Sequence, residues 1–323
     1  MSDALSQTLR VVQLVGAIFI NARFTAPWCY HSPSAASAAP LLEPGAENVV
    51  IFHMVTQGEC YVELGAGAPL KLVAGDVVVF PQGHAHRMSS RPGLPPVAGK
   101  PLERVLARRP RQLSFGGGGT PTRLVCGYLA SSARLAQLLL AGLPPVVRVN
   151  VRGSAAGAWL EASVRYALAE ARSPRPGGAG VLAKHAEVLF IEVLRLYMHE
   201  QGEGHTGWLA ALNDRIVGEA LAALHRRPGH AWTLEELAQS VGTSRTVLAE
   251  RFQQLLGSSP IQYLTQWRML LASNLLCRSN ASLAHIAHEV GYQTDTAFSR
   301  AFRREFGAPP AAWRRAQAAR RPG

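Results

Sequence analysis

Residues 232–260 of the chain read WTLEELAQSVGTSRTVLAERFQQLLGSSP, and residues 282–310 read SLAHIAHEVGYQTDTAFSRAFRREFGAPP. The two stretches share one pattern of apolar residues, glycine and proline. Gly242 in the first stretch and Gly291 in the second are 49 residues apart, while the glycines near the two C-terminal ends are 50 apart. The stretches are therefore two copies of one unit that differ by a single inserted residue.

Each copy has the features of a helix-turn-helix. Its first helix can begin at a hydroxyl side chain, Thr233 or Ser282, which is able to accept a hydrogen bond from a free backbone N–H of the first turn. Apolar side chains then recur at helical spacing. The stripe residues are Leu234, Leu237, Ala238 and Val241 in one copy and Leu283, Ile286, Ala287 and Val290 in the other. Gly242 or Gly291 follows, where a left-handed residue turns the chain without a Cβ clash.

A second helix is predicted to begin at Ser244 in the first copy and near Thr294 in the second. Its inner side is expected to bury Val247, Leu248, Phe252 and Leu255 in one copy and Ala297, Phe298, Phe302 and Phe306 in the other. Its outer side stays free for a partner. The residues predicted to contact that partner are Ser244, Arg245, Thr246, Ala249, Glu250, Gln253, Thr294, Asp295, Thr296, Ser299, Arg300 and Arg303.

These side chains are suited to reading DNA in the major groove. Arginine can bind guanine with two hydrogen bonds, glutamine can bind adenine, a carboxylate can accept from cytosine, and a threonine methyl can touch thymine. A single copy could equally present a solvated helix face, but two copies joined by an apolar-periodic segment, residues 261–277, favour DNA. One helix over residues 260–278 would be about 28 Å long. Successive major-groove turns lie about 34 Å apart, so both recognition helices could lie on one face of the duplex.

Residues from about 210 to 315 resemble the DNA-binding domain of the AraC/XylS family of bacterial transcription regulators. The resemblance is carried by Leu234, Leu237, Ala238, Gly242, Ser244, Leu248, Phe252, Gly257, Pro260, Tyr263, Arg268, Met269, Ile286, Ala287, Gly291, Phe298, Phe302, Phe306, Gly307, Pro310 and Trp313. It implies binding to double-stranded promoter DNA and a contact with RNA polymerase. Members often place a basic or amide side chain where this chain has Ala249 and Glu250, which leaves the base preference of the first helix open.

Composition agrees with this interpretation. A length of 323 residues and an apolar fraction of 48% suit a globular protein of two domains and a connector. The net charge is +12, and all fourteen basic residues beyond residue 208 are arginines, which favour nucleic acid, although a GC-rich genome would favour arginine as well. The four cysteines show no CxxC spacing and are expected to be reduced. No apolar run approaches 18 residues and no signal peptide is evident, so the sequence predicts a cytoplasmic protein without membrane contact.

The first part of the chain shows a short helical pattern followed by β patterns. Residues 3–13 have apolar side chains at helical spacing. Strands are predicted at residues 15–28, 49–55, 60–64, 70–73, 76–80 and 122–129. Several short strands at such spacing indicate an antiparallel barrel or sandwich. Residues 32–47 and 91–111 are predicted to be irregular.

The stretch GDVVVFPQGHAH at residues 75–86 matches Gly-x5-Pro-x-Gly-x2-His at every fixed position. It thereby resembles the second cupin motif, and this implies a sensor barrel like that of many AraC-type regulators. The predicted ligand-binding residues are His53, Tyr61, His84 and His86. Catalytic cupins usually add two histidines and a glutamate from their first motif to hold a metal, but residues 43–48, where these histidines belong, contain none. A barrel with an organic ligand, or with none, is therefore favoured over a metal site, and no cofactor is predicted.

From residue 135 the pattern is helical, with helices predicted at residues 135–143, 159–172 and 181–200. The last helix carries a wide apolar face made by Leu182, Ala186, Leu189, Val193, Leu196, Phe190, Leu194 and Tyr197. Such a face could pack on the barrel and also on a second copy, so a homodimer is predicted, with packing inside one chain as the alternative. Residues 201–207 are the expected hinge, and residues 209–224 the first helix of the DNA-binding domain.

The sequence thus predicts an α+β protein. A cupin-like antiparallel β-barrel is expected at residues 1–134, connector or dimerisation helices at 135–207, and an all-α domain with two helix-turn-helix units at 208–323. The predicted function is sequence-specific transcription regulation, without enzyme activity, in which the barrel senses a small molecule. The alternative is a metal-dependent cupin enzyme, an oxygenase or isomerase, fused to a DNA-binding domain. A third possibility is DNA binding without sequence preference, which would follow salt steeply.

Overall fold

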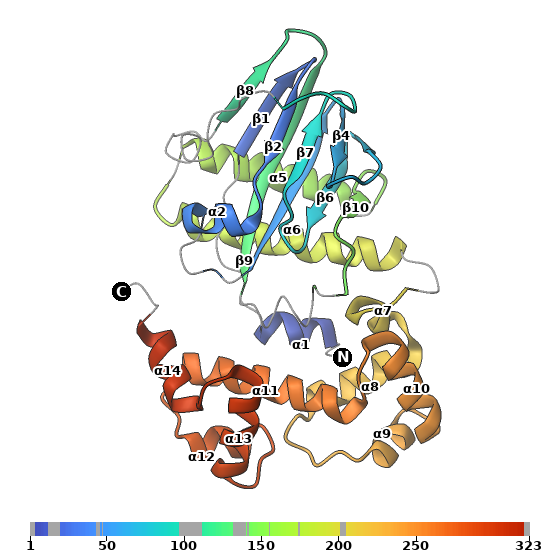
Figure 1. Cartoon of the computed structure of the whole chain (residues 1–323), viewed down its shortest axis with the longest axis vertical. Helices are drawn as coiled ribbons and strands as arrows, with labels where there is room; N and C mark the ends of the chain where they lie inside the picture. The colour runs from blue at the N-terminus through green and yellow to red at the C-terminus, as the bar shows by residue number, and fades with distance from the viewer. Residues whose placement is uncertain are drawn as a thin grey trace. The chain divides into compact units, whose positions relative to one another are not determined.

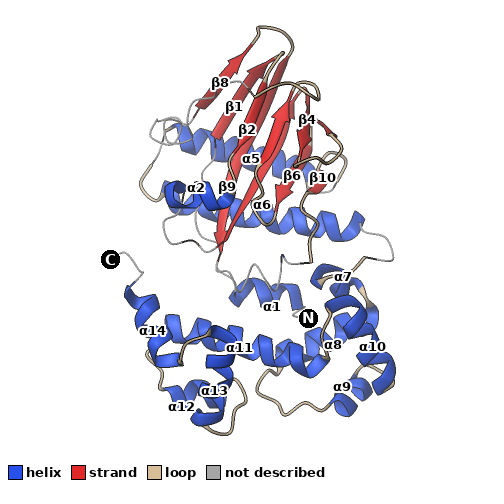
Figure 2. Ribbon diagram, in the orientation of Figure 1, coloured by secondary structure: helices blue, strands red, loops and turns tan. Residues whose placement is uncertain are grey.

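The computed structural model describes residues 4–11, 20–42, 46, 48–96, 112–131, 140, 142–154, 156–173, 175–200 and 205–319. The chain divides into two compact units. One comprises Leu14–Gly202, and the other combines Met1–Gln13 with Glu203–Gly323. The first contains β-sheets and helices, and the described residues of the second form helices without a β-strand (Figures 1 and 2). The predicted α+β class with a C-terminal helical domain is therefore confirmed.

The strands of the first unit form two sheets, of order β10-β6-β3-β9-β1-β8 and β2-β7-β4-β5. Their bounds are β1 Ile20–Thr25, β2 Cys29–Ser32, β3 Asn48–Gln57, β4 Glu59–Glu63, β5 Leu70–Val73, β6 Asp76–Phe80, β7 His86–Ser89, β8 Gln112–Gly116, β9 Pro121–Ser131 and β10 Val147–Asn150. Neighbouring strands pair antiparallel except β1 and β8, which are parallel. The inner faces of both sheets share one core, in which Phe24, Trp28, Phe80 and Met88 are almost fully buried.

Strand β3 is buried on both faces because different layers cover it. Ile51 and His53 line a cavity between the sheets. Phe52 and Met54, which point to the opposite face by strand alternation, line a second cavity together with residues of the helices α5 (Gly157–Arg172) and α6 (Gly178–Glu200). Most of the apolar face predicted on α6 is used in this packing, since Leu182, Ala186, Leu189, Phe190, Val193 and Leu194 are buried. Four large apolar side chains of these helices remain exposed, namely Trp159, Tyr166, Val181 and Val188. A homodimer stays a prediction, and sedimentation of the full chain would measure its oligomeric state.

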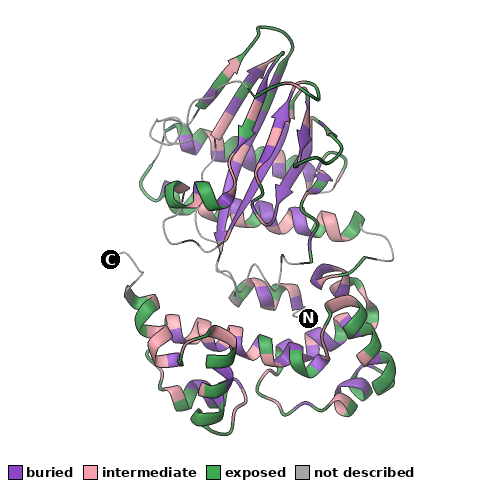
Figure 3. Cartoon of the chain, viewed as in Figure 1, coloured by how far each residue is buried: buried purple, intermediate pink, exposed green. Residues whose placement is uncertain are grey.

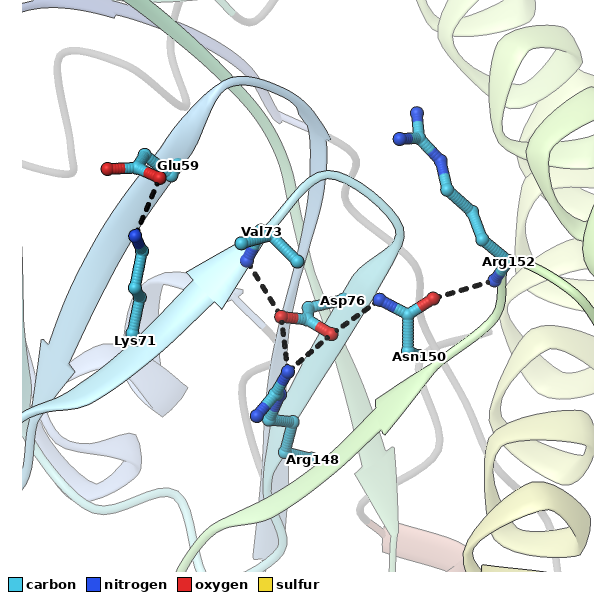
Figure 4. Close-up of polar contacts among 7 residues, drawn as sticks. All are labelled: Glu59, Lys71, Val73, Asp76, Arg148, Asn150 and Arg152. Atoms are coloured by element: carbon cyan, nitrogen blue, oxygen red, sulfur yellow. Dashed lines mark hydrogen bonds and ion pairs between the residues drawn. The ribbon is translucent and has the colours of Figure 1, made fainter.

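The aspartate of the cupin motif anchors strand β10 (Figure 4). The preceding Gly75 has φ +99°, a conformation that glycine adopts without a Cβ clash. The buried Asp76 accepts hydrogen bonds from the backbone N–H of Val73 at 2.7 Å and from the amide of Asn150 at 2.8 Å. The guanidinium of Arg148 lies 3.0 Å from the same carboxylate. One carboxylate thus joins the β5–β6 turn to a strand that lies about 70 residues further along the chain.

The helical unit consists of α1 Ala4–Val11, α7 Trp208–Asn213, α8 Arg215–Arg226, α9 Leu234–Ser240, α10 Arg245–Leu256, α11 Pro260–Arg278, α12 Leu283–Glu289, α13 Asp295–Phe306 and α14 Pro310–Ala319. The helix predicted at residues 209–224 is divided at Asp214. The carboxylate of Asp214 accepts hydrogen bonds from the N–H groups of Ile216 and Val217 and caps α8, which ends α7. Among the described residues, no helix is long and apolar enough to cross a membrane.

The N-terminal helix α1 belongs to the helical unit rather than to the sheets. It packs on α8 and α11, with Ala4 and Thr8 buried. The first 13 residues of the domain predicted at residues 1–134 thus fall in the helical unit, and the sheet unit extends to residue 202, through most of the segment predicted as a connector at residues 135–207. The amphipathic pattern predicts that α1 needs an apolar partner, but it carries no information on which partner that is.

Residues 32–47 were predicted to form a loop, and this is wrong for α2, Ala35–Leu42. The alanine-rich segment has high helix propensity, and both of its ends are held by distant groups. Ala35 N–H donates to the carbonyl oxygen of Gly83, and the hydroxyl of Tyr128 donates to that of Leu42. Strands β2, β7, β8 and β10 were not predicted. Much of the irregular segment 91–111 and of the helix predicted at residues 135–143 lies outside the described residues.

Candidate DNA-binding interface and sensor cavity

The recognition helices α10 and α13 begin at equivalent caps. Ser244 Oγ accepts a hydrogen bond from the backbone N–H three residues later at 3.3 Å, and Thr294 Oγ1 does the same at 3.2 Å. The turn before each helix contains a glycine with positive φ, +65° at Gly242 and +85° at Gly291. Both helix-turn-helix units therefore form as the sequence predicts, with matching local geometry.

The outer sides of both helices are exposed to solvent (Figure 3). Of the twelve predicted contact residues, ten are exposed, whereas Ala249 and Ser299 are partly buried. The opposite sides are held in the protein, because Leu248, Phe252, Phe298 and Phe302 are fully buried. Each helix thus presents a solvent-exposed, mostly polar face, while the side chains of its opposite face fill the hydrophobic core.

Val247 and Ala297 were predicted to be buried, and this is wrong. Val247 is 39% exposed, and Ala297 is exposed at the equivalent place in the second unit. Both lie in the first turn of their helix, where no other element packs over them. An apolar side chain on such a face can contact a thymine methyl. Val247 and Ala297 are therefore additional candidate contact residues. They were not predicted as such because the apolar stripe of each helix was taken to include one residue more than the structure buries.

The arginines of the two recognition helices differ in their partners. On α10, Arg245 is paired with Glu235 at 3.2 Å, and Arg251 is paired with Asp214. On α13, Arg300 and Arg303 have no hydrogen-bonded or ionic partner among the described residues. These two guanidinium groups can bind a phosphate or a base without first losing an ion pair.

A largely apolar cavity lies between the two sheets of the first unit, with a volume of about 60 Å³. It is lined by Ile20, Phe24, Tyr30, Ser32, Pro33, Ala38, Leu42, Ile51, His53, Met88, Leu113, Leu124, Cys126, Gly127 and Tyr128. A water site needs roughly 10–15 Å³ on such a measure. The cavity therefore has room for a small organic molecule rather than for a long chain.

His53 lines this cavity and forms a hydrogen-bonded pair with His86, which is not among the lining residues. Their Nε2 atoms are 2.8 Å apart, and Nδ1 of His86 lies 2.9 Å from the carbonyl oxygen of His84. Because a carbonyl oxygen only accepts, Nδ1 of His86 carries a proton. Burial lowers the pKa of His86 to about 4, so at neutral pH its Nε2 is a bare acceptor and His53 donates from its own Nε2.

This proton arrangement leaves one unused acceptor. The pKa of His53 lies well below its ordinary value, first because the side chain is buried and then because His86 is close. His53 is therefore neutral, and its Nδ1 carries a lone pair. That atom is buried and has no partner among the described residues. His53 thus lines the cavity and has one hydrogen-bond acceptor without a partner among the described residues.

The other two residues predicted to bind a ligand lie elsewhere. Tyr61 is partly exposed on β4 and His84 is exposed, and neither lines the cavity. Cys126, which was not predicted to bind a ligand, also lines the cavity and is paired with His53 in the β3–β9 register. The alternation of side chains along β9 could have indicated that Cys126 faces the interior. Among the described residues there is no group of three or more His, Cys, Asp or Glu that could hold a metal ion.

Comparison with known proteins gives consistent matches. A cupin family model matches residues 3–199, and a helix-turn-helix domain model matches residues 237–316. An AraC-like transcription regulator of Streptomyces lividans is 36% identical over 275 residues, which cover 84% of this chain and 88% of the relative. The HTH-type transcriptional regulator AlkR of Acinetobacter baylyi is 27% identical over 97% of this chain and 99% of the relative.

Among solved structures, the DNA-binding domain of AdpA in complex with a target DNA is 36% identical and covers 34% of this chain and 97% of that chain, with a TM-score of 0.32. The family models and the full-length relatives agree with the two units described above. The chain therefore belongs to the AraC family of transcription regulators and combines an N-terminal cupin domain with a C-terminal helix-turn-helix domain.

Proposed function

We propose that the protein reads promoter DNA with the outer faces of α10 and α13, placed in two major-groove segments on one side of the duplex. The observation that carries this proposal is the pair of exposed faces on equally capped helices joined by α11. Helix α11 is continuous over 19 residues and begins with a capping box at Ser259 and Gln262. It is about 28 Å long at the standard rise, which is compatible with groove segments one turn apart.

Replacing Arg300 with alanine is expected to weaken binding to a selected operator by roughly 1–3 kcal/mol, because an unpaired guanidinium can bind a guanine with two hydrogen bonds. The operator would be obtained by selecting duplexes from a random pool with the full chain, and affinity would be measured by fluorescence anisotropy at fixed salt. Arg215→Ala is the matched control, since it also removes one exposed arginine from the helical unit but from α8, which is not a recognition helix. If both variants lose affinity equally and for all sequences, Arg300 reads no base.

We further propose that a small neutral molecule with one hydrogen-bond donor fills the cavity and that the cupin domain acts as a sensor rather than an enzyme. The supporting observations are a largely apolar lining and, within it, the side chain of His53, whose Nδ1 has no hydrogen-bond partner among the described residues. A carboxylate would face this lone pair, and any charged group would lose its hydration at a cost of several kcal/mol. Regulation then requires that the filled cavity favours one state of the protein over another.

Butan-1-ol and its isomer diethyl ether form a matched pair of probes, because only the alcohol can donate a hydrogen bond. The alcohol is expected to bind about fivefold more tightly, as one neutral hydrogen bond contributes about 1 kcal/mol. It should also shift the ring nitrogen resonance of His53 in an NMR titration. His53→Leu should abolish the preference while leaving the fold intact. Equal binding of both isomers to the wild-type protein would contradict the proposed ligand class.

A further inference from the structure

The two helix-turn-helix units contact each other at a site that we name the inter-repeat joint, formed by residues 228–230, Arg268 and residues 291–292. Arg268 Nε donates to the carbonyl oxygen of Pro228 at 2.6 Å, and its Nη2 donates to that of His230 at 2.8 Å. The same guanidinium lies 6.0 Å from the centre of the Tyr292 ring. One side chain in the middle of α11 therefore touches the α8–α9 loop of the first unit and the α12–α13 turn of the second.

The two backbones also approach closely at the joint. A Cβ atom added to Gly291 would lie 2.7 Å from the carbonyl oxygen of Gly229 and 2.9 Å from its Cα. A Cβ atom added to Gly229 would lie 3.1 Å from the carbonyl oxygen of Glu289. A side chain at Gly291 would therefore force the two backbones apart, whereas one at Gly229 would need a shift of only a few tenths of an ångström. The units are therefore in contact at the joint as well as joined through α11.

Arg268 lies at the point along α11 where the helix leaves the core of the first helix-turn-helix unit and enters the core of the second. Trp267 stacks on His225 of α8, with ring centres 3.8 Å apart. Met269 and Ala272 belong instead to the core of the second unit. A helix alone fixes the distance between two bodies, but a second contact beside it is needed to resist rotation around it. The joint supplies that contact at the boundary between the two cores.

We propose that the inter-repeat joint, held by Arg268, fixes the orientation of α13 relative to α10 and so sets the operator spacing that the protein accepts. Arg268 is a positioning residue here and need not touch DNA. This inference rests on the proposed function, because it assumes that both recognition helices read one duplex. One inserted base pair moves the second half-site by about 3.4 Å and rotates it by roughly a tenth of a turn. Rigidly joined helices cannot follow that change.

The chemistry of the joint requires arginine in particular. Its planar guanidinium sends two N–H groups in fixed directions to two different carbonyl oxygens, and a lysine ammonium cannot reproduce this fork. Lys at position 268 would keep the positive charge but lose the paired geometry. The conservative replacement therefore separates a positioning role from a role of charge alone.

The test uses the full chain and duplexes built on the selected operator, with no, one or two base pairs inserted between the half-sites. For the wild-type protein, one insertion is expected to weaken binding about tenfold or more, comparable with the loss of a base contact. Arg268→Ala and Arg268→Lys are both expected to bind the selected spacing more weakly and to lose most of this discrimination, so that the affinities for the different spacings converge.

Arg278→Ala is the matched control, because Arg278 is an exposed arginine at the end of the same helix, and this variant should keep the wild-type discrimination. Thermal melting and binding to a duplex with the second half-site alone report whether each unit remains folded. Undiminished discrimination in the Arg268 variants, or an equal loss at every spacing, would overturn the role of the joint. Absence of any spacing preference in the wild-type protein would instead contradict the proposed reading of two groove segments.

Discussion

Lowering the pH from 6.5 to 4 is expected to decrease the free energy of unfolding of each unit by about 3 kcal/mol or more, because each unit contains buried histidine whose pKa lies below its ordinary value. In the helical unit the residue is His225, which is 5% exposed, stacks on Trp267 and lies 2.8 Å from the hydroxyl of Tyr263. Burial lowers the pKa of His225 to about 3. In the sheet unit they are His86, whose pKa burial lowers to about 4, and its partner His53, whose pKa burial also lowers.

The direction of the effect follows from which state binds the proton. The unfolded chain takes up a proton on each histidine near pH 6.5, whereas the folded chain resists protonation until the pH approaches 4 for His86 and 3 for His225. The stability provided by the neutral side chains is therefore fully present above pH 6.5 and is lost as the pH falls below it.

Urea unfolding at several pH values would measure this loss, and hydrogen exchange would assign it to each unit. His225→Gln keeps a polar side chain without a titrating proton, so the helical unit of this variant should show a flatter pH dependence while the sheet unit remains acid-sensitive. A free energy of unfolding that stays constant between pH 6.5 and pH 4.5 in the wild-type protein would be incompatible with buried neutral histidines at positions 53, 86 and 225.

Asp76→Ala is expected to destabilise the cupin domain by roughly 2–4 kcal/mol. The carboxylate is fully buried and accepts from Val73, Asn150 and Arg148, so its removal leaves a backbone N–H and an amide without an acceptor. Arg148 is 40% exposed and can be hydrated, which places the loss below that of a fully buried ion pair. Strand β10 should lose its anchor, and faster hydrogen exchange at residues 147–150 would show this.

The neighbouring pair of Glu59 and Lys71 provides the control for Asp76 (Figure 4). Oε2 of Glu59 and Nζ of Lys71 are 2.8 Å apart, but the two side chains are 55% and 50% exposed. Surface ion pairs of this kind contribute roughly 0–1 kcal/mol to the free energy of unfolding. Glu59→Ala should therefore leave the unfolding midpoint almost unchanged. If Asp76→Ala behaved like Glu59→Ala in a denaturation experiment, burial and anchoring would not be what makes the aspartate important.

The DNA-binding domain was largely predictable because its determinants act over short distances in the chain. Hydroxyl caps such as Ser244 and Thr294 act on the next turn of helix, and Gly242 and Gly291 act on the turn in which they stand. The same holds for the continuous helix α11, which begins at a capping box and ends before Ser279. The prediction that Val247 is buried was wrong, because the exposure of this side chain depends on whether another element of the fold covers the first turn of α10.

By itself the sequence determined the duplicated helix-turn-helix units, their caps and turns, and the strand of the cupin motif at residues 76–80, since these depend on interactions between residues a few positions apart. The tertiary structure alone decided that α1 packs on α8 and α11, that His53 meets His86, and that Asp76 anchors β10 and Arg268 joins the two units. Such partners lie tens to hundreds of residues apart, and their contact is chosen by the packing of the whole fold, which no local period or spacing in the chain expresses.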